Sequence, residues 1–485
     1  MAELVRAIGG GIAVTVEIAL LAALGSLLLG ALVTALRICP VPALRWPATA
    51  YVVGFRSIPL AVVCFLAAFG LPAVGLPLLG SGLSYPRLFV LALVVYTGAF
   101  VSDAIIAGLD TVPRGHAEQA HVLGATAGQR TRYVIVPQTW RPAVVKVGRV
   151  LITLIKNSAL AGSFGVVGDL SQTVDGLAGA YPGSIIATLV GVAAAYLIMT
   201  MPLTMMLDRV ERGLGGAEAG SARPEPARTG RAANLMVTAA LIVLAYVCVY
   251  RPLARAGQFS ARLWAPMTDP GDPTFALFWG RIGAGLQSTL GAAALTIIAS
   301  LLGGTALVML QVVLDDRRRA SGVAVRLSMN VLRGLPVVIT ILIVSRGLPA
   351  LGMPLADPLW YLVVGLTLHN LVAVAEIIRS GLHALPESHR EAAYLMGAGP
   401  VRTARTILLP QALPIVLPAL TSRLIVVLMD TSLAFVVGYE ELLAVARQAN
   451  SELQAPIQVY LTVALIYLAL NVVLAAFIRR PSRLA

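Results

Sequence analysis

Two polar segments of the sequence carry residues suited to binding a partner. The clearer one, ESHREAAYLMGAGPVRTARTILLPQ, spans residues 387–411 and contains Glu391, Ala392, Ala393 and Gly397. The alanines favour a helix and let another surface approach closely, whereas a glycine cannot continue a helix cheaply. We therefore predict a short helix that ends in a sharp turn and offers charge to a partner. The simpler alternative is a solvated loop that happens to be amphipathic.

A second copy of this segment lies 273 residues earlier in the chain. It spans residues 117–138, AEQAHVLGATAGQRTRYVIVPQ, and places Glu118, Ala120 and Gly124 at the same spacing. Gln119 replaces the middle alanine of the motif. A constant offset without a gap indicates a tandem duplication. Because two copies share the same spacing, the solvated-loop alternative becomes much weaker.

The composition indicates a polytopic α-helical membrane protein. The chain has 485 residues, 58% hydrophobic and 12% charged, with repeated apolar runs of about 20 residues, the length that spans a bilayer. Its net charge is +13, but the arginines concentrate in short loops beside the apolar runs, where they set orientation. Nucleic acid is therefore not an expected partner, whereas membrane lipid is. The three cysteines have no CxxC spacing, which indicates neither a disulfide framework nor a metal site.

The apolar runs divide the chain into two five-helix halves with one additional helix. Candidate spans lie at about 11–36, 48–70, 87–109, 142–161 and 183–207, then at about 234–250, and then at about 281–310, 324–345, 358–382, 413–435 and 456–478. We predict a first transmembrane domain at 1–208, a linker at 209–231, the extra helix with an external loop at 232–280, and a second transmembrane domain at 281–485. The expected fold is all-α, a tandem parallel repeat of five-helix units with about 11 transmembrane helices.

The extra helix has a topological explanation. Five spans leave the linker on the opposite side from the N-terminus, so one added span is needed to insert the second half in the same orientation as the first. Nearly all loop arginines then fall on one side, which should be cytoplasmic. We therefore expect the N-terminus outside the cell, the C-terminus in the cytoplasm, and both polar segments in the cytoplasm.

The polar segments resemble the cytoplasmic EAA loop of ATP-binding-cassette importer permeases. Four positions of the second copy match that pattern, namely Glu391, Gly397, Ile407 and Pro410. Further segments resemble the polar amino-acid uptake family, namely Arg333-Gly334-Leu335-Pro336, its counterpart Arg56-Ser57-Ile58-Pro59, residues 376–382 (EIIRSGL) and residues 430–433 (DTSL). The halves look most like the paired permease subunits of actinobacterial glutamate importers, here joined in one polypeptide.

The resemblance implies a bacterial, multi-pass protein of the cytoplasmic membrane that translocates polar amino acids, with glutamate or aspartate favoured. Each EAA loop would dock one of two copies of an ABC ATPase subunit, and an extracytoplasmic amino-acid-binding protein would deliver the substrate. ATP and Mg²⁺ would be bound by the ATPase, because the chain has no GxxxxGK[ST] phosphate loop. The chain itself is therefore expected to be a permease subunit without enzymatic activity or a cofactor of its own.

Ionisable and polar residues within the spans are the candidate substrate contacts, because a charge at membrane depth costs roughly 2.5 to 3.5 kcal/mol on insertion scales. Their cations would meet the carboxylates of an acidic amino acid. The alternative is that they pair with one another as structural contacts between helices. The predicted set is Arg149, Lys156, Asn157, Glu376, Arg423, Asp430 and Thr431.

The two halves differ at several of these positions. The first half has Asp103 and Ile106 where the second has Glu376 and Arg379. Together with Gln119, this difference predicts weaker coupling to the ATPase in the first half.

Two other classes of function compete with the importer. An ion-coupled secondary amino-acid transporter is also polytopic and duplicated, but it gives no reason for two matching EAA loops. A membrane-embedded enzyme would need a catalytic constellation, and the sequence has neither HExxH nor GxSxG. A lipid-facing scaffold would not need charges inside its spans.

Overall fold

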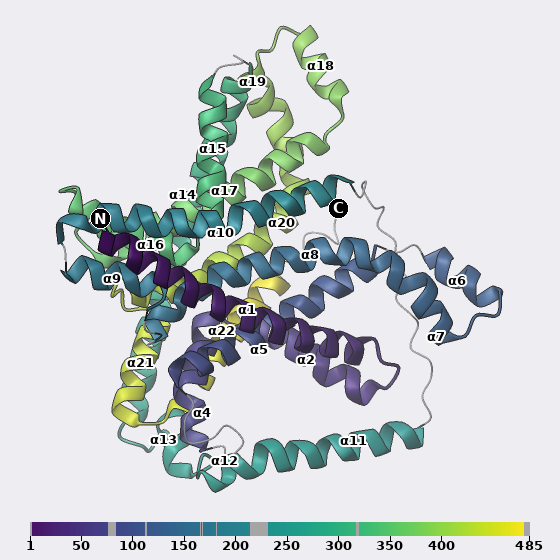
Figure 1. The fold of residues 1–485 in the computed structure, drawn as a ribbon, viewed down its shortest axis with the longest axis vertical. Coiled ribbons are helices and arrows are strands. Elements are labelled where there is room, and N and C mark those ends of the chain that lie inside the picture. The colour runs from purple at the N-terminus through teal and green to yellow at the C-terminus, as the bar shows by residue number, and fades with distance from the viewer. Residues whose placement is uncertain are drawn as a thin grey trace. The chain divides into compact units, whose positions relative to one another are not determined.

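The computed structural model describes residues 2–75, 84–111, 114–164, 166, 168–180, 182–213, 231–316 and 320–479. All elements in these ranges are helices (Figure 1). The all-α class predicted from the sequence is therefore confirmed. The predicted linker, 209–231, lies mostly outside the described residues, because 214–230 are not among them.

The helices of the first repeat precede residue 214. They are α1 (Ala2–Ile38), α2 (Pro42–Ser57), α3 (Leu60–Phe65), η1 (Leu66–Gly70), α4 (Leu71–Val74), α5 (Tyr85–Leu109), α6 (Arg114–Val122), α7 (Ala127–Arg130), η3 (Thr131–Ile135), α8 (Val136–Asn157), η4 (Ser158–Phe164), α9 (Leu170–Ala180), η5 (Pro182–Ser184) and α10 (Ile185–Gly213). The additional segment forms α11 (Arg231–Ala245), η6 (Tyr246–Tyr250), α12 (Arg251–Arg255) and α13 (Ala261–Thr268).

The second repeat follows the same order of helices. It consists of α14 (Phe275–Asp316), α15 (Ala320–Gly334), α16 (Val337–Ala350), α17 (Pro358–Ala384), α18 (Glu387–Leu395), α19 (Pro400–Thr403), η7 (Ala404–Leu408), α20 (Leu409–Asp430), η8 (Thr431–Val436), α21 (Leu442–Leu453) and α22 (Pro456–Arg479). From α18 to α20 its helices begin and end at the positions that the 273-residue offset predicts from α6 to α8.

The number of spans agrees approximately with the predicted eleven. Eight helices of the described ranges are long and apolar enough to cross a membrane, or up to ten if each of two bent pairs counts as one span. The predicted span at 142–161 corresponds to α8, which carries Lys146, Arg149 and Lys156 and is therefore less apolar than the others. The additional helix is a candidate span over Asn234–Arg255, and its side chains are exposed.

Two spans that the sequence predicts as continuous are sharply bent. The axis turns by 110° between α2 and the following α3 to α4 segment, and by 107° between α15 and α16. Both breaks precede a proline, Pro59 or Pro336, which removes a backbone donor and restricts the residue before it to extended backbone. Ile58 accordingly has φ −110° and ψ 136°.

Close helix packing within each repeat depends on small residues. A Cβ atom added at Gly108 of α5 would lie 2.7 Å from the Cβ of Ala143 on α8. Such close approach of backbones is typical of membrane helices, whose association is driven by packing contacts and not by the hydrophobic effect. In the second repeat the core lies between α14, α15, α17 and α20, with fully buried residues such as Val374 and Ala412.

Contacts group the chain into two compact units that do not follow the repeats completely. Unit 1 contains residues 1–173, 198–272 and 455–464, and unit 2 contains 174–197, 273–454 and 465–485. Each unit thus includes the start of the last long helix of the other repeat. In unit 1, Tyr460 of α22 stacks on Phe65 of α3, with ring centroids 5.5 Å apart.

Candidate functional site

The two polar segments fold into matching docking loops, which we define as α6 with α7 and α18 with α19. In each loop a nine-residue helix is followed by a turn and then by a four-residue helix (Figure 1). The sequence prediction of a short helix, a sharp turn and a second helix is therefore correct for both copies.

A glycine with positive φ ends each docking helix. Gly124 has φ +82° and Gly397 has φ +75°. In both loops the amide of the residue after the glycine donates to a carbonyl five residues earlier at 3.0 Å, from Ala125 to Ala120 and from Ala398 to Ala393. This six-to-one bond is the Schellman cap, which needs a residue in the left-handed region and therefore favours glycine.

The docking loops expose the charges and apolar side chains that a partner would contact. Glu118, Glu391 and Ala392 are exposed, whereas Ala393 is fully buried and Ala120 is 9% exposed. Ala392 is therefore available to a partner, whereas Ala393 and Ala120 are buried beneath the helices.

Each loop also presents two large apolar residues directly before its glycine. Their exposed fractions are 85% for Val122, 85% for Leu123, 90% for Leu395 and 74% for Met396. The sequence analysis did not predict this surface. The signal was available, because both pairs occupy the same two positions of the repeat.

The predicted path residue Glu376 forms an ion pair within unit 2. Its Oε1 accepts from Arg333 Nη1 at 3.0 Å, which joins α17 to the arginine three residues before Pro336. This contact agrees with the structural alternative for Glu376, and its role in the path stays a prediction.

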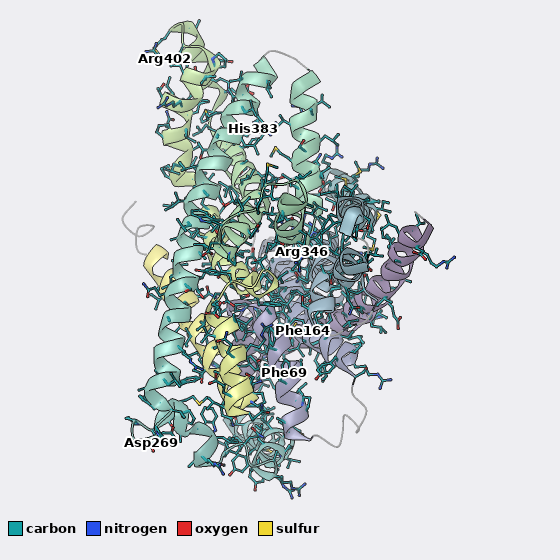
Figure 2. The ribbon with its side chains drawn as sticks, turned by 90° about the vertical axis from the view of Figure 1, so that its left-hand side faces the viewer. Phe69, Phe164, Asp269, Arg346, His383 and Arg402 are labelled. Atoms are coloured by element: carbon teal, nitrogen blue, oxygen red, sulfur yellow. The ribbon has the colours of Figure 1, made fainter. Side chains whose placement is uncertain are left out.

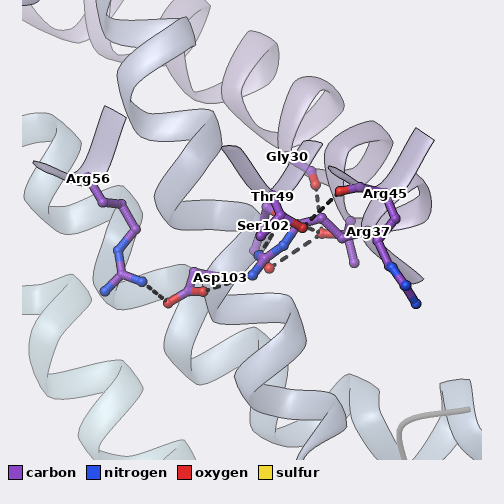
Figure 3. A network of polar contacts seen from close by, with 8 residues as sticks. Gly30, Arg37, Arg45, Thr49, Arg56, Ser102 and Asp103 are labelled. Atoms are coloured by element: carbon purple, nitrogen blue, oxygen red, sulfur yellow. Dashed lines mark hydrogen bonds and ion pairs between the residues drawn. The ribbon is translucent and has the colours of Figure 1, made fainter. Parts of the chain in front are cut away.

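The first repeat builds the corresponding contact with two arginines. Asp103 accepts from Arg56 at 2.5 Å and from Arg37 at 3.5 Å, and Arg37 also donates to Ser102 at 3.2 Å (Figure 3). In both repeats the acid of the third span thus binds the arginine that precedes the bend. Sequence reasoning quoted both arginines as motif residues but did not pair them with the acids.

The cations predicted for the first half lie on α8, with Arg149 inside the helix and Lys156 at its C-terminal end. Arg149 forms ion pairs with Asp208, at 3.0 Å, and with Glu211, both on α10. Lys156 and Asn157 are half-buried at the C-terminal end of the helix, where the chain enters η4. Unit 1 therefore brings Lys156 and Asn157 together but places Arg149 two turns away, against acidic partners.

The second half places Asp430 and Thr431 at the junction of α20 and η8, with Arg423 two turns earlier on α20. Arg423 is half-buried, and Asp430 and Glu376 exert the electrostatic attractions on it. Its Nε is buried without a hydrogen-bond partner among the described residues. Thr431 is fully buried and donates to the carbonyl of Leu428 at 2.7 Å.

Buried acids cap the short helices that follow these regions. Asp169 accepts from the amides of Ser171 and Gln172 at 3.0 Å, and Glu441 accepts from the amides of Leu443 and Ala444 at 2.9 Å. Burial raises the pKa of both carboxyl groups, against the lowering effect of these bonds, to about 8 for Glu441. The sequence analysis predicted neither cap.

The family model for the inner membrane component of binding-protein-dependent transport systems matches residues 26–215 and 316–483. The two matches cover most of both repeats. The chain belongs to this family. It is a multi-pass permease subunit of the amino-acid ABC transporter type, with two permease units in one polypeptide.

Named relatives match the chain over the length of one permease unit. The glutamate transport system permease protein GluC of Corynebacterium efficiens is 34% identical over 204 residues, which are 41% of this chain and 89% of that protein. The probable glutamine ABC transporter permease protein GlnM of Bacillus subtilis is 34% identical over 200 residues, 41% of this chain and 89% of that protein. A solved structure, described as an amino acid ABC transporter with histidines, is 26% identical, covers 44% of this chain and 96% of that one, and has a TM-score of 0.41.

Proposed function

We propose that this permease works in an ATP-driven importer of acidic amino acids. The two docking loops would each bind one copy of an ABC ATPase subunit, which would hold ATP and Mg²⁺. The observation that carries this proposal is the matched surface of α6 and α18, where an exposed glutamate and two exposed apolar residues precede a glycine cap. An apolar anchor surrounded by charge suits a specific protein contact.

Glutamate or aspartate is the favoured substrate class. The relatives GluC and GluD of Corynebacterium are described as glutamate transport proteins. The buried Nε of Arg423 is an orphaned donor, and buried polar groups normally have a partner. A substrate carboxylate would supply one, and attraction between the charges would be stronger in a narrow, poorly hydrated path than in water.

The orientation follows from the same assignment. Docking to a cytoplasmic ATPase requires both loops to face the cytoplasm, which places the N-terminus outside and the C-terminus inside. An amino-acid-binding protein would then deliver the substrate at the outer face.

Reconstitution of the full chain with its ATPase and binding protein tests the proposal. We expect the loaded binding protein to stimulate ATP hydrolysis. Uptake of glutamate or aspartate should require ATP and should proceed without an ion gradient. The variants Lys156→Gln and Arg423→Gln should reduce this stimulation while the complex still assembles and keeps its basal hydrolysis. Uptake that requires an ion gradient at constant ATP would instead identify a secondary transporter. Failed assembly, or unchanged stimulation, would show that the two cations are structural.

A further inference from the structure

A small basic cavity lies in unit 2, beside the second docking loop. Its volume is about 240 Å³, and its walls come from α14, α17, α18, α19 and η7. Its polar lining includes Gln311, Arg379, His383 and Arg390. Apolar residues, Val308 and Leu408 among others, complete the wall. The cavity is thus basic on one side and apolar on the other.

The cavity holds cationic side chains without acidic partners. Among the described residues, neither Arg379 nor Arg390 forms an ion pair, and no aspartate or glutamate lines the cavity. Arg379 Nε lies 3.4 Å from His383 Nε2. Two arginines and a histidine that converge without a counter-charge favour an anionic ligand.

The cavity lies where two of the predicted apolar runs end. Gln311 directly follows the run at about 281–310, and His383 directly follows the run at about 358–382. Figure 2 shows His383 on its helix, with Arg402 of the docking loop farther toward the tip. Apolar runs of this length end at the membrane surface, where lipid phosphates lie.

The first repeat has no equivalent of this cavity chemistry. The 273-residue offset places Ile106, Asp110 and Ala117 where the second repeat has Arg379, His383 and Arg390. These three side chains are therefore not required to build the docking loop, because the first loop has the same backbone without them.

We propose that this cavity binds the phosphate of an anionic phospholipid such as phosphatidylglycerol. The apolar lining takes the upper part of the acyl chains, and Arg379 and Arg390 bind the phosphate. Basic pockets between spans at the cytoplasmic side are suited to such headgroups. The assignment to the cytoplasmic leaflet rests on the orientation given under the proposed function. Because Arg390 belongs to α18, a bound lipid holds the second docking loop against α17.

Lipid retention by the purified full chain, without ATPase, tests this inference independently of transport. The chain is placed in nanodiscs that contain phosphatidylglycerol in phosphatidylcholine, and bound lipid is counted by native mass spectrometry. If each of the two arginines that bind the phosphate contributes about a fivefold gain, the size found for a basic residue at an anionic surface, Arg379→Gln with Arg390→Gln should weaken retention by about 25-fold. The matched control is Arg402→Gln, which removes an exposed charge from the same loop outside the cavity and should leave retention unchanged.

Three results would overturn the inference. Wild-type protein that retains phosphatidylglycerol no better than phosphatidylcholine would show that no such site exists. Equal loss in the Arg402 variant would show a diffuse charge effect. Displacement of the lipid by millimolar inorganic phosphate or glutamate would assign the cavity to a soluble anion. Size-exclusion profiles and melting temperatures of all variants check that each one is folded.

Discussion

Replacing Gly397 by alanine tests whether the backbone of the docking loop governs coupling. No atom lies within 4 Å of the place a Cβ would take, so the substitution causes no clash. The cost is therefore the left-handed conformation alone, about 1 to 2 kcal/mol for a residue with a side chain. A cost of that size lowers the population of the native loop about 5- to 30-fold relative to alternatives. We expect ATPase binding and stimulated hydrolysis to fall correspondingly, with membrane insertion intact.

Two controls separate backbone from side chain. Gly399 lies in the same loop, also in open space, but with φ −67°, so Gly399→Ala should be close to neutral. Asparagine tolerates the left-handed region better than alanine, so Gly397→Asn should keep more binding than Gly397→Ala. Gly124→Ala should reduce binding of the ATPase less, if Gln119 marks weaker coupling in the first loop. If Gly397→Ala binds the ATPase like wild type, or Gly397→Asn is the more damaging change, the reasoning from the cap is wrong.

Three further outcomes are expected. Burial raises the pKa of Glu441 from an ordinary 4.5 to about 8, so between these pH values the folded state holds a proton that the unfolded state has lost. Stability should therefore fall as pH rises through this window. The melting temperature of Glu441→Gln should depend less on pH over the same range. Glu376→Gln and Arg333→Gln together should destabilise the fold by about 0.5 to 1 kcal/mol less than the sum of the two single changes, and additive effects would leave the 3.0 Å ion pair without energetic weight. In a cysteine-free background, a cysteine at exposed Ser451 should react with an impermeant thiol reagent from outside, and one at Ser388 only after permeabilisation, whereas labelling from the same side would refute the proposed orientation.

Local chemistry made the docking loops predictable from the sequence. Glycine at 397 ends a helix because only it adopts φ +75° without cost, and the same residue recurs at 124. Two copies at a constant spacing gave the signal that one copy could not give. The bounds of α6 and α18 follow from these residues without any knowledge of their neighbours.

Features that depend on residues distant in the sequence were harder to predict from the sequence. Pro59 and Pro336 were visible as ordinary membrane prolines, but a bend of more than 100° requires space beside the helix, which no local pattern reports. The role of Glu441 was not predicted, because its carboxyl group caps α21 and accepts from Tyr467, at 3.2 Å, on another helix. The inclusion of residues 455–464 in unit 1 likewise depends on contacts between segments far apart in sequence.

The contrast between the two repeats indicates what each part of the chain binds. The docking loops have the same helix lengths, the same caps and an exposed apolar pair at the same two positions. Two matching surfaces are what two copies of one partner require, as in a symmetric interface. The loops differ at Gln119, which has Ala392 as its counterpart, and the residues behind them differ at Arg379, which has Ile106 as its counterpart. We therefore expect each loop to contact one ATPase, and any difference in coupling between the halves to arise from Gln119 or from the charged groups behind the second loop.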